Sequence, residues 1–372
     1  MSRHELSLGR ILGIPIAVDY SWFLIFGLLT WSLAIGYYPP EFKNWSHTED
    51  WMMGAVTSAA LFVSVLLHEL GHSIVAIRFK IPVKRITLFI FGGVSQIGAE
   101  SPRPSVEFAV AIAGPLVSFV LAAILWLLQP IVAAVAPLLA LAKYLSLMNG
   151  LLGLFNLIPG FPLDGGRVLR AIVWSATHDL RRSTLLAANV GRFIAFLFIA
   201  LGVWQVFEGR LVNGLWIGFI GWFLESAAVG QVQQQVVADL LLGHKVREAM
   251  VTDYLSVSPT DTLQNLVDQH VLAAGKRTFV VAANGDSLGI LTLSNIKEVP
   301  RVEWPTTKAF QAMIPMNEIQ SVGPDTELSS VIQKLDRNGV NQLPVLRDGI
   351  FVGILSRDGF IDYLRVLREV RS

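Results

Sequence analysis

The residues most clearly able to carry out chemistry are His68, Glu69 and His72, in the run His-Glu-Leu-Gly-His. On a helix, side chains four positions apart lie on one face, so both imidazoles can bind one metal ion. Glu69 is next to the first histidine and can act as the base for a water bound to that metal. Zinc lowers the pKa of such a water to near neutrality, which supplies hydroxide to attack an amide. The pattern therefore predicts a zinc-dependent hydrolase.

The His-Glu-Leu-Gly-His run lies within a long apolar segment, between residues 61–67 and 73–77. Ionisable side chains inside a membrane segment are costly and are functional candidates by default. The alternative is a polar cluster without function at the cytosol-proximal end of a helix. Three ionisable residues within five positions favour the functional interpretation.

A third protein ligand is expected, with the fourth position left for water. The best candidate is Asp164, the one acidic residue of the run 156–166, which contains three Gly and two Pro. Such irregular backbone is tolerated at membrane depth where protein or a cavity surrounds it. From this segment alone, a metal ligand and a turn or N-cap residue are equally good interpretations of Asp164. Glu100 and Glu107 are rival carboxylates that we expect in or near an exposed loop.

The elements that must position these residues are membrane spans. The 372-residue chain is 53% hydrophobic and 15% charged, and its apolar runs end near residue 228. A helix needs roughly 20 apolar residues to cross a bilayer core. Six segments meet or approach this length, and we expect spans at residues 16–38, 52–77, 107–128, 131–158, 185–207 and 211–228.

The basic residues of the loops predict the orientation of these spans. Lysines and arginines gather before the first span, between the second and third, and between the fourth and fifth, whereas the alternate loops hold only Lys43 and Arg210. With an even number of spans, both termini are expected in the cytosol and the protein in the cell membrane. The N-terminus has no pattern of a cleaved signal peptide. The chain has no cysteine, which excludes thiolate zinc sites, and no basic cluster that would indicate nucleic acid.

The region after residue 230 contains an internal repeat with a period of about 64 residues, which suits two small tandem domains. The repeat is clearest where Gly289-Ile-Leu-Thr292 is echoed by Gly353-Ile-Leu-Ser356. Each copy reads as a helix followed by short β-rich segments. We expect a membrane domain at 1–230 and small domains at 231–303 and 304–372, the two copies burying each other's apolar surface.

Taken together, the run 68–72 and the motif Asn156…Pro159…Pro162-Leu-Asp164-Gly make the membrane region resemble the site-2 protease family of intramembrane metalloproteases. The resemblance covers the first to the sixth span, including Ala113-Gly114-Pro115 in the third. It implies His68, His72 and Asp164 as zinc ligands, with one zinc per chain, and Glu69 as catalytic base. It further implies that Asn156 contacts substrate or the developing oxyanion.

In this family, the stretch corresponding to residues 89–97 is a membrane-embedded strand or hairpin that suits pairing with an unwound substrate. The physical reason is independent of the family. A peptide bond in a transmembrane helix is shielded by its own hydrogen bonds, and an extended substrate restores them by adding to a strand edge. A simple re-entrant loop is the equally weighted alternative.

The soluble repeat resembles a CBS-domain pair, a module that often binds adenine nucleotides between its copies. In nucleotide-binding pairs an Asp usually follows the repeated motif and accepts from ribose hydroxyls. Here the corresponding positions hold Asn295 and Gly359, with Asp358 one residue early. A structural module, or one that forms a homodimer, has equal weight with a nucleotide site.

The sequence therefore predicts an α-helical polytopic membrane domain of about six transmembrane helices, followed by an α/β tandem CBS-type domain. The predicted function is an intramembrane zinc endopeptidase that cleaves transmembrane segments of other proteins in the lipid bilayer, regulated by the cytosolic pair. The alternative class is a non-catalytic membrane protein, either a metal transporter or an inactive protease-like scaffold. A scaffold would have lost a residue of the His68–His72 run, and a transporter would spread polar residues along several spans.

Overall fold

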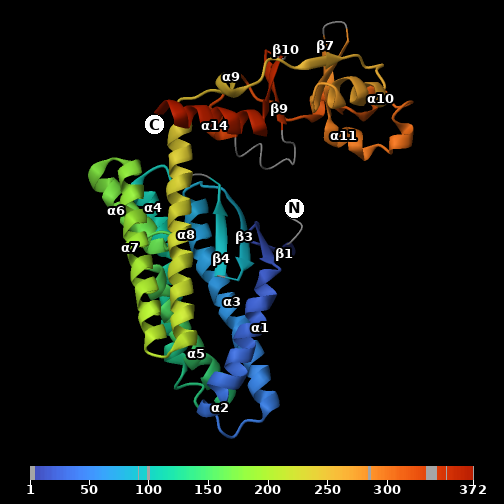
Figure 1. Ribbon diagram of the computed structural model, residues 1–372. Helices are drawn as coiled ribbons and strands as arrows, with labels where there is room; N and C mark the ends of the chain where they lie inside the picture. The colour runs from blue at the N-terminus through green and yellow to red at the C-terminus, as the bar shows by residue number, and fades with distance from the viewer. Residues whose placement is uncertain are drawn as a thin grey trace. The chain divides into compact units, whose positions relative to one another are not determined.

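The computed structural model describes residues 5–90, 92–98, 101–283, 286–331, 342–348 and 350–371. The chain divides into two compact units, Met1–Gln235 and Val236–Ser372. The first is a helical bundle with a small sheet, and the second is a mixed α/β unit (Figure 1).

Among the described residues, six helical segments are long and apolar enough to cross a membrane. The first segment, residues 21–41, consists of α1 (Ser21–Ser32), a π-helical stretch η1 (Leu33–Tyr37) and α2 (Tyr38–Glu41). The others are α3 (His47–Arg78), α4 (Pro104–Leu128), α5 (Ala136–Asn156), α7 (Leu180–Phe207) and α8 (Leu211–Leu241). A shorter helix, α6 (Asp164–Thr177), joins α5 to α7.

Residues 16–19, expected in the first span, belong instead to a strand. β1 (Glu5–Ile11) and β2 (Ile14–Asp19) form a hairpin, and β2 pairs in parallel with β3 (Val83–Phe89). The β-branched residues Ile14, Ile16 and Val18 alternate along β2 and are buried, which is the period of a strand rather than of a helix. Apolarity alone did not separate this strand from the helix that follows it.

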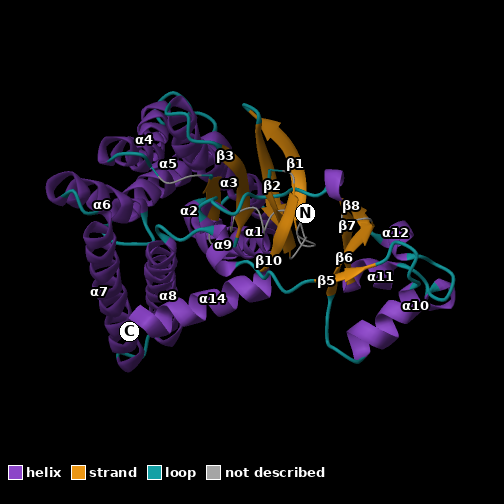
Figure 2. Ribbon diagram, turned by 90° about the horizontal axis from the view of Figure 1, so that it is seen from above, coloured by secondary structure: helices purple, strands orange, loops and turns teal. Residues whose placement is uncertain are grey.

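The sheet of the membrane unit has the order β1-β2-β3-β4, so β4 (Gly92–Ile97) is an edge strand. β3 and β4 are antiparallel, as the predicted strand or hairpin at 89–97 requires; Phe91 of that segment lies outside the described residues. Seen from above (Figure 2), the strands of this unit lie to one side of α4, α5 and α6. Ile14, Ile16 and Ile86 pack against Leu70, which fixes the sheet beside the helix that carries the two histidines.

Helix α3 is the longest element and begins with a capping box. The Ser46 hydroxyl accepts from the Glu49 amide, and the Glu49 carboxylate accepts from the Ser46 amide at 2.6 Å. At about 1.5 Å per residue, His68 lies roughly 30 Å along the helix from its first residue. This distance is about the thickness of the bilayer core, so the histidines lie near the opposite end of the span.

In the second unit, the part of the chain that the structure describes forms two sheets. One has the order β5-β6-β7-β8, with β5 (Leu255–Val257), β6 (Thr278–Ala283), β7 (Asp286–Thr292) and β8 (Ile314–Pro315). The other pairs β9 (Gln342–Arg347) with β10 (Ile350–Ser356). Apart from the end of α8, the helices among the described residues of this unit are α9 (Val246–Ala249), α10 (Leu263–Leu266), α11 (Leu293–Glu298), α12 (Ala309–Ala312) and α14 (Arg357–Arg371), with π-helical η2 (Val267–Leu272) and 3₁₀ turns η3 (Arg301–Glu303) and η4 (Met316–Glu318).

The two repeats bury apolar surface against each other, as the sequence predicts. Val280 and Ile290 of the first copy pack with Phe351 and Ile354 of the second. The short helices are also exchanged between copies. Val246, at the start of the first repeat, lies in the core that contains Leu343 and Leu355, and Ala309, at the start of the second, lies in the core of the first.

A polar network links α9 to α14 at the edge of the core that contains Val246, Leu343 and Leu355. Glu248 Oε2 lies 2.6 Å from His244 Nδ1 and accepts from the Tyr363 hydroxyl at 2.9 Å. The Lys245 amide donates to the other carboxylate oxygen. These hydrogen bonds, that from His244 foremost, lower the pKa of Glu248 to about 2.

We expect this network to make the stability of the second unit depend on pH. A carboxyl whose pKa is lowered by folding stabilises the fold above its unfolded pKa, and this contribution is lost as pH falls towards the folded value. Glu248→Gln should therefore lower the melting temperature at pH 6, and its difference from wild type should shrink between pH 5 and pH 3. Scanning calorimetry of the full chain measures this. Glu318→Gln, in η4, is the matched control, and a difference that stays constant with pH would contradict the assignment.

Candidate metal and catalytic site

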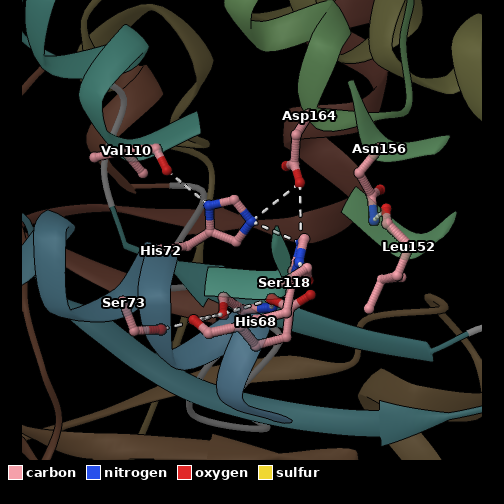
Figure 3. A network of polar contacts seen from close by, with 10 residues as sticks. His68, His72, Ser73, Val110, Ser118, Leu152, Asn156 and Asp164 are labelled. Carbon is pink, nitrogen blue, oxygen red and sulfur yellow. Dashed lines mark hydrogen bonds and ion pairs between the residues drawn. The ribbon is translucent and has the colours of Figure 1, made fainter. Parts of the chain in front are cut away.

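Helix α3 brings His68 and His72 to the same point. Their Nε2 atoms lie 3.2 Å apart, and each lies 3.1 Å from Asp164 Oδ2 (Figure 3). The two imidazoles are almost fully buried, and the Asp164 side chain is 15% exposed. Among the described residues, these three form the one group whose ligand atoms could hold a metal ion. The structure thus assembles the three residues that the sequence suggested as ligands.

Helix α4 orients both imidazoles. His72 Nδ1 donates to the carbonyl oxygen of Val110 at 2.7 Å, and His68 Nδ1 lies 2.8 Å from the Ser118 hydroxyl. A carbonyl can only accept, so the proton of a neutral His72 is on Nδ1 and the lone pair is on Nε2. We assign the same tautomer to His68, with Ser118 as acceptor.

Gly114 of α4 leaves the space that the two rings occupy. A Cβ atom at this position would lie 2.2 Å from His72 Nε2 and 2.6 Å from His68 Nε2. Both distances are far shorter than any van der Waals contact, so a larger residue here would displace the rings. The Ala-Gly-Pro run of α4 therefore has a steric role at the site.

Asp164 reaches the histidines because the chain folds back after α5. It is the first residue of α6 and follows the loop 157–163, which packs against the start of that helix. A Cβ at Gly165 would lie 2.3 Å from the Ile158 carbonyl oxygen, and one at Gly166 would lie 2.4 Å from the Phe161 nitrogen. Only glycine fits at these two positions. Asp164 is thus inside the helix, and the N-cap position is occupied by Leu163.

The three ligand atoms suit a tetrahedral zinc ion. Zinc bonds of about 2.0–2.1 Å place neighbouring ligand atoms roughly 3.3 Å apart, close to the observed separations. Two imidazole lone pairs and a carboxylate oxygen at such distances repel one another unless a cation or proton lies between them. Each histidine also has the outer hydrogen bond that metal-binding imidazoles normally make.

The carboxylate of Glu69 is held by β4. Its Oε2 atom accepts from the Ser95 amide at 3.1 Å and from the Ser95 hydroxyl at 2.8 Å. Gly93 lies against the same side chain, since a Cβ there would be 2.6 Å from Glu69 Cγ. The candidate base is therefore held by the edge strand, through the hydrogen bonds of Ser95 and the close contact with Gly93.

The expectation that Glu107 lies near an exposed loop is wrong. Glu107 is in α4, is 1% exposed and binds Arg170 of α6. No local pattern could pair two residues that are 63 positions apart in the sequence. Ser95 and Ser118 were missed for the same reason, because a lone serine in an apolar segment carries no spacing signal. Glu100 lies outside the described residues.

Asn156 is not part of the polar contacts of the ligands. It is the last residue of α5, and its Nδ2 donates to the Leu152 carbonyl oxygen at 3.0 Å. Figure 3 places it on the same side of the site as Asp164. Its contact with substrate or oxyanion stays a prediction.

Comparison with known proteins identifies both parts of the chain. Residues 56–134 and 130–199 match peptidase family M50, and residues 246–301 and 311–366 match the CBS domain. The solved site-2 protease from Methanocaldococcus jannaschii is 32% identical and covers 62% of this chain and 95% of its own, with a TM-score of 0.44.

Two relatives align over nearly the whole chain. A protein of Synechocystis sp. named as a zinc metalloprotease is 34% identical over 97% of this chain and 96% of its own length. The zinc metalloprotease of Methanocaldococcus jannaschii is 29% identical over 98% of this chain and 97% of its own. The chain therefore belongs to peptidase family M50, as an intramembrane zinc metalloprotease of the site-2 type with a C-terminal CBS pair.

Proposed function

We propose that this multi-pass membrane protein cleaves transmembrane segments of other membrane proteins, with His68, His72 and Asp164 as zinc ligands and Glu69 as catalytic base. The observation that carries the proposal is the convergence of three ligand atoms within 3.2 Å beside a carboxylate held by an edge strand. None of these residues is missing, which disfavours an inactive scaffold.

The roles of the side chains follow from their contacts. When bound, zinc supplies a water nucleophile at neutral pH. Because Ser95 binds Oε2 of Glu69 through both its amide and its hydroxyl, we assign proton transfer to Oε1. Glu69 takes the proton from the attacking water and then gives it to the amine as the carbon–nitrogen bond breaks. Asn156 is kept as a candidate contact for the oxyanion.

The edge of β4 offers a path for the unwound substrate. Since the Ser95 amide donates to Glu69, it points away from β3 and towards the unpaired side of the strand. A substrate added along this side would pass next to Glu69. It would pair with outward main-chain groups of β4 other than the Ser95 amide, which Glu69 already binds. This geometry favours strand addition over a simple re-entrant loop.

An apolar groove continues this path. It has a volume of about 530 Å³ and is lined by Leu61 and Val65 of α3, by Met148, Leu152 and Phe155 of α5, and by Ile158 of the loop that follows α5. Val65 is one helical turn before Glu69, and a Cβ at Gly92, the first residue of β4, would touch it at 4.0 Å. We propose that the groove receives apolar side chains of the substrate segment that extends past the end of β4.

We propose that both termini lie in the cytosol and that the CBS pair, at 231–303 and 304–372, regulates cleavage. In the first copy the polar end of the repeated motif is already used, because Thr292 and Asn295 cap α11 through each other. In the second, the Ser356 hydroxyl accepts from the Gly359 amide. These contacts favour a structural or dimer-forming role at the motif over an adenine-nucleotide site.

Replacing the base should separate chemistry from metal binding. Glu69→Gln should lower the cleavage rate of a transmembrane substrate by about 10²–10⁴-fold, the usual contribution of a general base, while zinc content stays near one per chain. Rates from purified protein and metal analysis of both samples measure this. Cleavage by the variant at the wild-type rate would sink the assignment, and wild type without zinc would sink the ligand set.

Gly93→Ala should misplace the base without removing a ligand. The added methyl would overlap the Glu69 side chain, so kcat should fall about 10–100-fold while zinc content is unchanged. Val94→Ala is the control, because Val94 is on the same strand and is 46% exposed. Equal kcat values for the Gly93 variant and wild type would show that Glu69 is not held as proposed.

Filling the groove should impair long substrates selectively. Met148→Trp should lower kcat/KM for a transmembrane substrate about tenfold, because apolar side chains lose their place, yet spare a short soluble peptide. Leu147→Trp is the control, since Leu147 is next along α5 and is 57% exposed. If both substrates or both variants are affected alike, the groove does not select the substrate.

A further inference from the structure

A buried ion pair joins α4 to α6, the two helices that orient or carry the proposed metal ligands. Glu107 of α4 is 1% exposed, and its Oε1 accepts from Arg170 Nε at 2.7 Å and from Arg170 Nη2. The Arg170 side chain is 17% exposed. Both donors of the guanidinium edge meet one carboxylate oxygen, so the pair fixes direction as well as distance.

The pair joins the two helices that build the metal site. Glu107 is three residues before Val110, whose carbonyl orients His72. Arg170 is six residues after Asp164, the ligand at the start of α6. The imidazoles are aligned by α4 and the carboxylate is carried by α6, so the spacing of these helices sets the ligand distances.

Arg170 also holds the loop that precedes Asp164. Its guanidinium lies over the Phe161 ring at 5.2 Å from the centroid. The Phe161 backbone in turn packs against α7, since a Cβ at Gly191 would lie 2.1 Å from the Phe161 carbonyl oxygen. The Arg170 side chain therefore contacts both α4, through Glu107, and the loop that precedes Asp164, through Phe161.

We propose that Glu107 and Arg170 form a positioning pair that holds Asp164 at its distance from His68 and His72 and so sets the zinc affinity. The proposal rests on the proposed ligand set. Loss of a residue that orients a metal ligand typically weakens metal binding 10–100-fold. Stability alone is a poor explanation for the pair, because a buried ion pair can often be replaced by apolar residues at no cost.

The test is the zinc dissociation constant of the full-length protein in detergent, measured by competition with a chelator, beside the melting temperature of the zinc-free protein. Arg170→Met should weaken zinc binding 10–100-fold. The double variant Glu107→Met/Arg170→Met removes both charges of the pair, and Arg167 still faces the charge of Asp164. It should therefore melt closer to wild type than Arg170→Met does, and still bind zinc at least tenfold more weakly. Arg170→Lys keeps the positive charge but loses the two parallel N–H donors of the guanidinium. Its zinc affinity should lie between those of wild type and Arg170→Met.

Arg182→Met is the control, because Arg182 is exposed on α7 and forms a local ion pair with Asp179. Its zinc affinity should equal that of wild type. Wild-type zinc affinity in the folded double variant or in Arg170→Lys would overturn the positioning role. If wild type itself binds no zinc, the ligand set has failed, and the two failures are thereby told apart.

Discussion

The membrane unit is organised around three lone pairs that meet within 3.2 Å, on side chains that are mostly buried. Such a group is unfavourable without a cation, and each surrounding contact limits how far it can relax. Ser118 and the Val110 carbonyl turn the lone pairs inward, and Gly114 removes the atom that would separate the rings. The surrounding contacts thus prevent the ligands from moving apart, so that metal binding is the way to relieve their repulsion.

The sheet has a corresponding role for the base. A carboxylate near a metal ion would bind the metal itself if it were free to rotate. The Ser95 amide and hydroxyl hold one oxygen of Glu69, and the missing side chain of Gly93 leaves the space in which Glu69 lies. The edge strand therefore serves two purposes, since the same backbone that restrains the base is the surface to which an extended peptide could add.

The sequence singled out the three proposed ligands and the proposed base because they lie in two short motifs whose spacing has chemical meaning, and the structure brings the three ligand atoms together. It also predicted the spans, because apolar length is a strong signal. It did not predict the strand at Ile14–Asp19, since a buried strand that runs into a span is continuous in hydropathy. The contacts of Ser95, Ser118 and Glu107 depend on tertiary packing, and no local pattern marks them. The residues around Glu107 in the sequence indicate an exposed loop, whereas its burial depends on Arg170 of another helix.

The exchange of short helices between the two repeats has a consequence for biosynthesis. Val246 lies in a core whose strands, β9 and β10, are synthesised about 100 residues later. The core of the first repeat is likewise incomplete until Ala309 of the second repeat has been synthesised. At about 5–20 residues per second, the first helix spends several seconds without its partners. Neither repeat can complete its core before the other has been synthesised. We therefore expect the two repeats to fold as one unit, after the membrane spans have been synthesised.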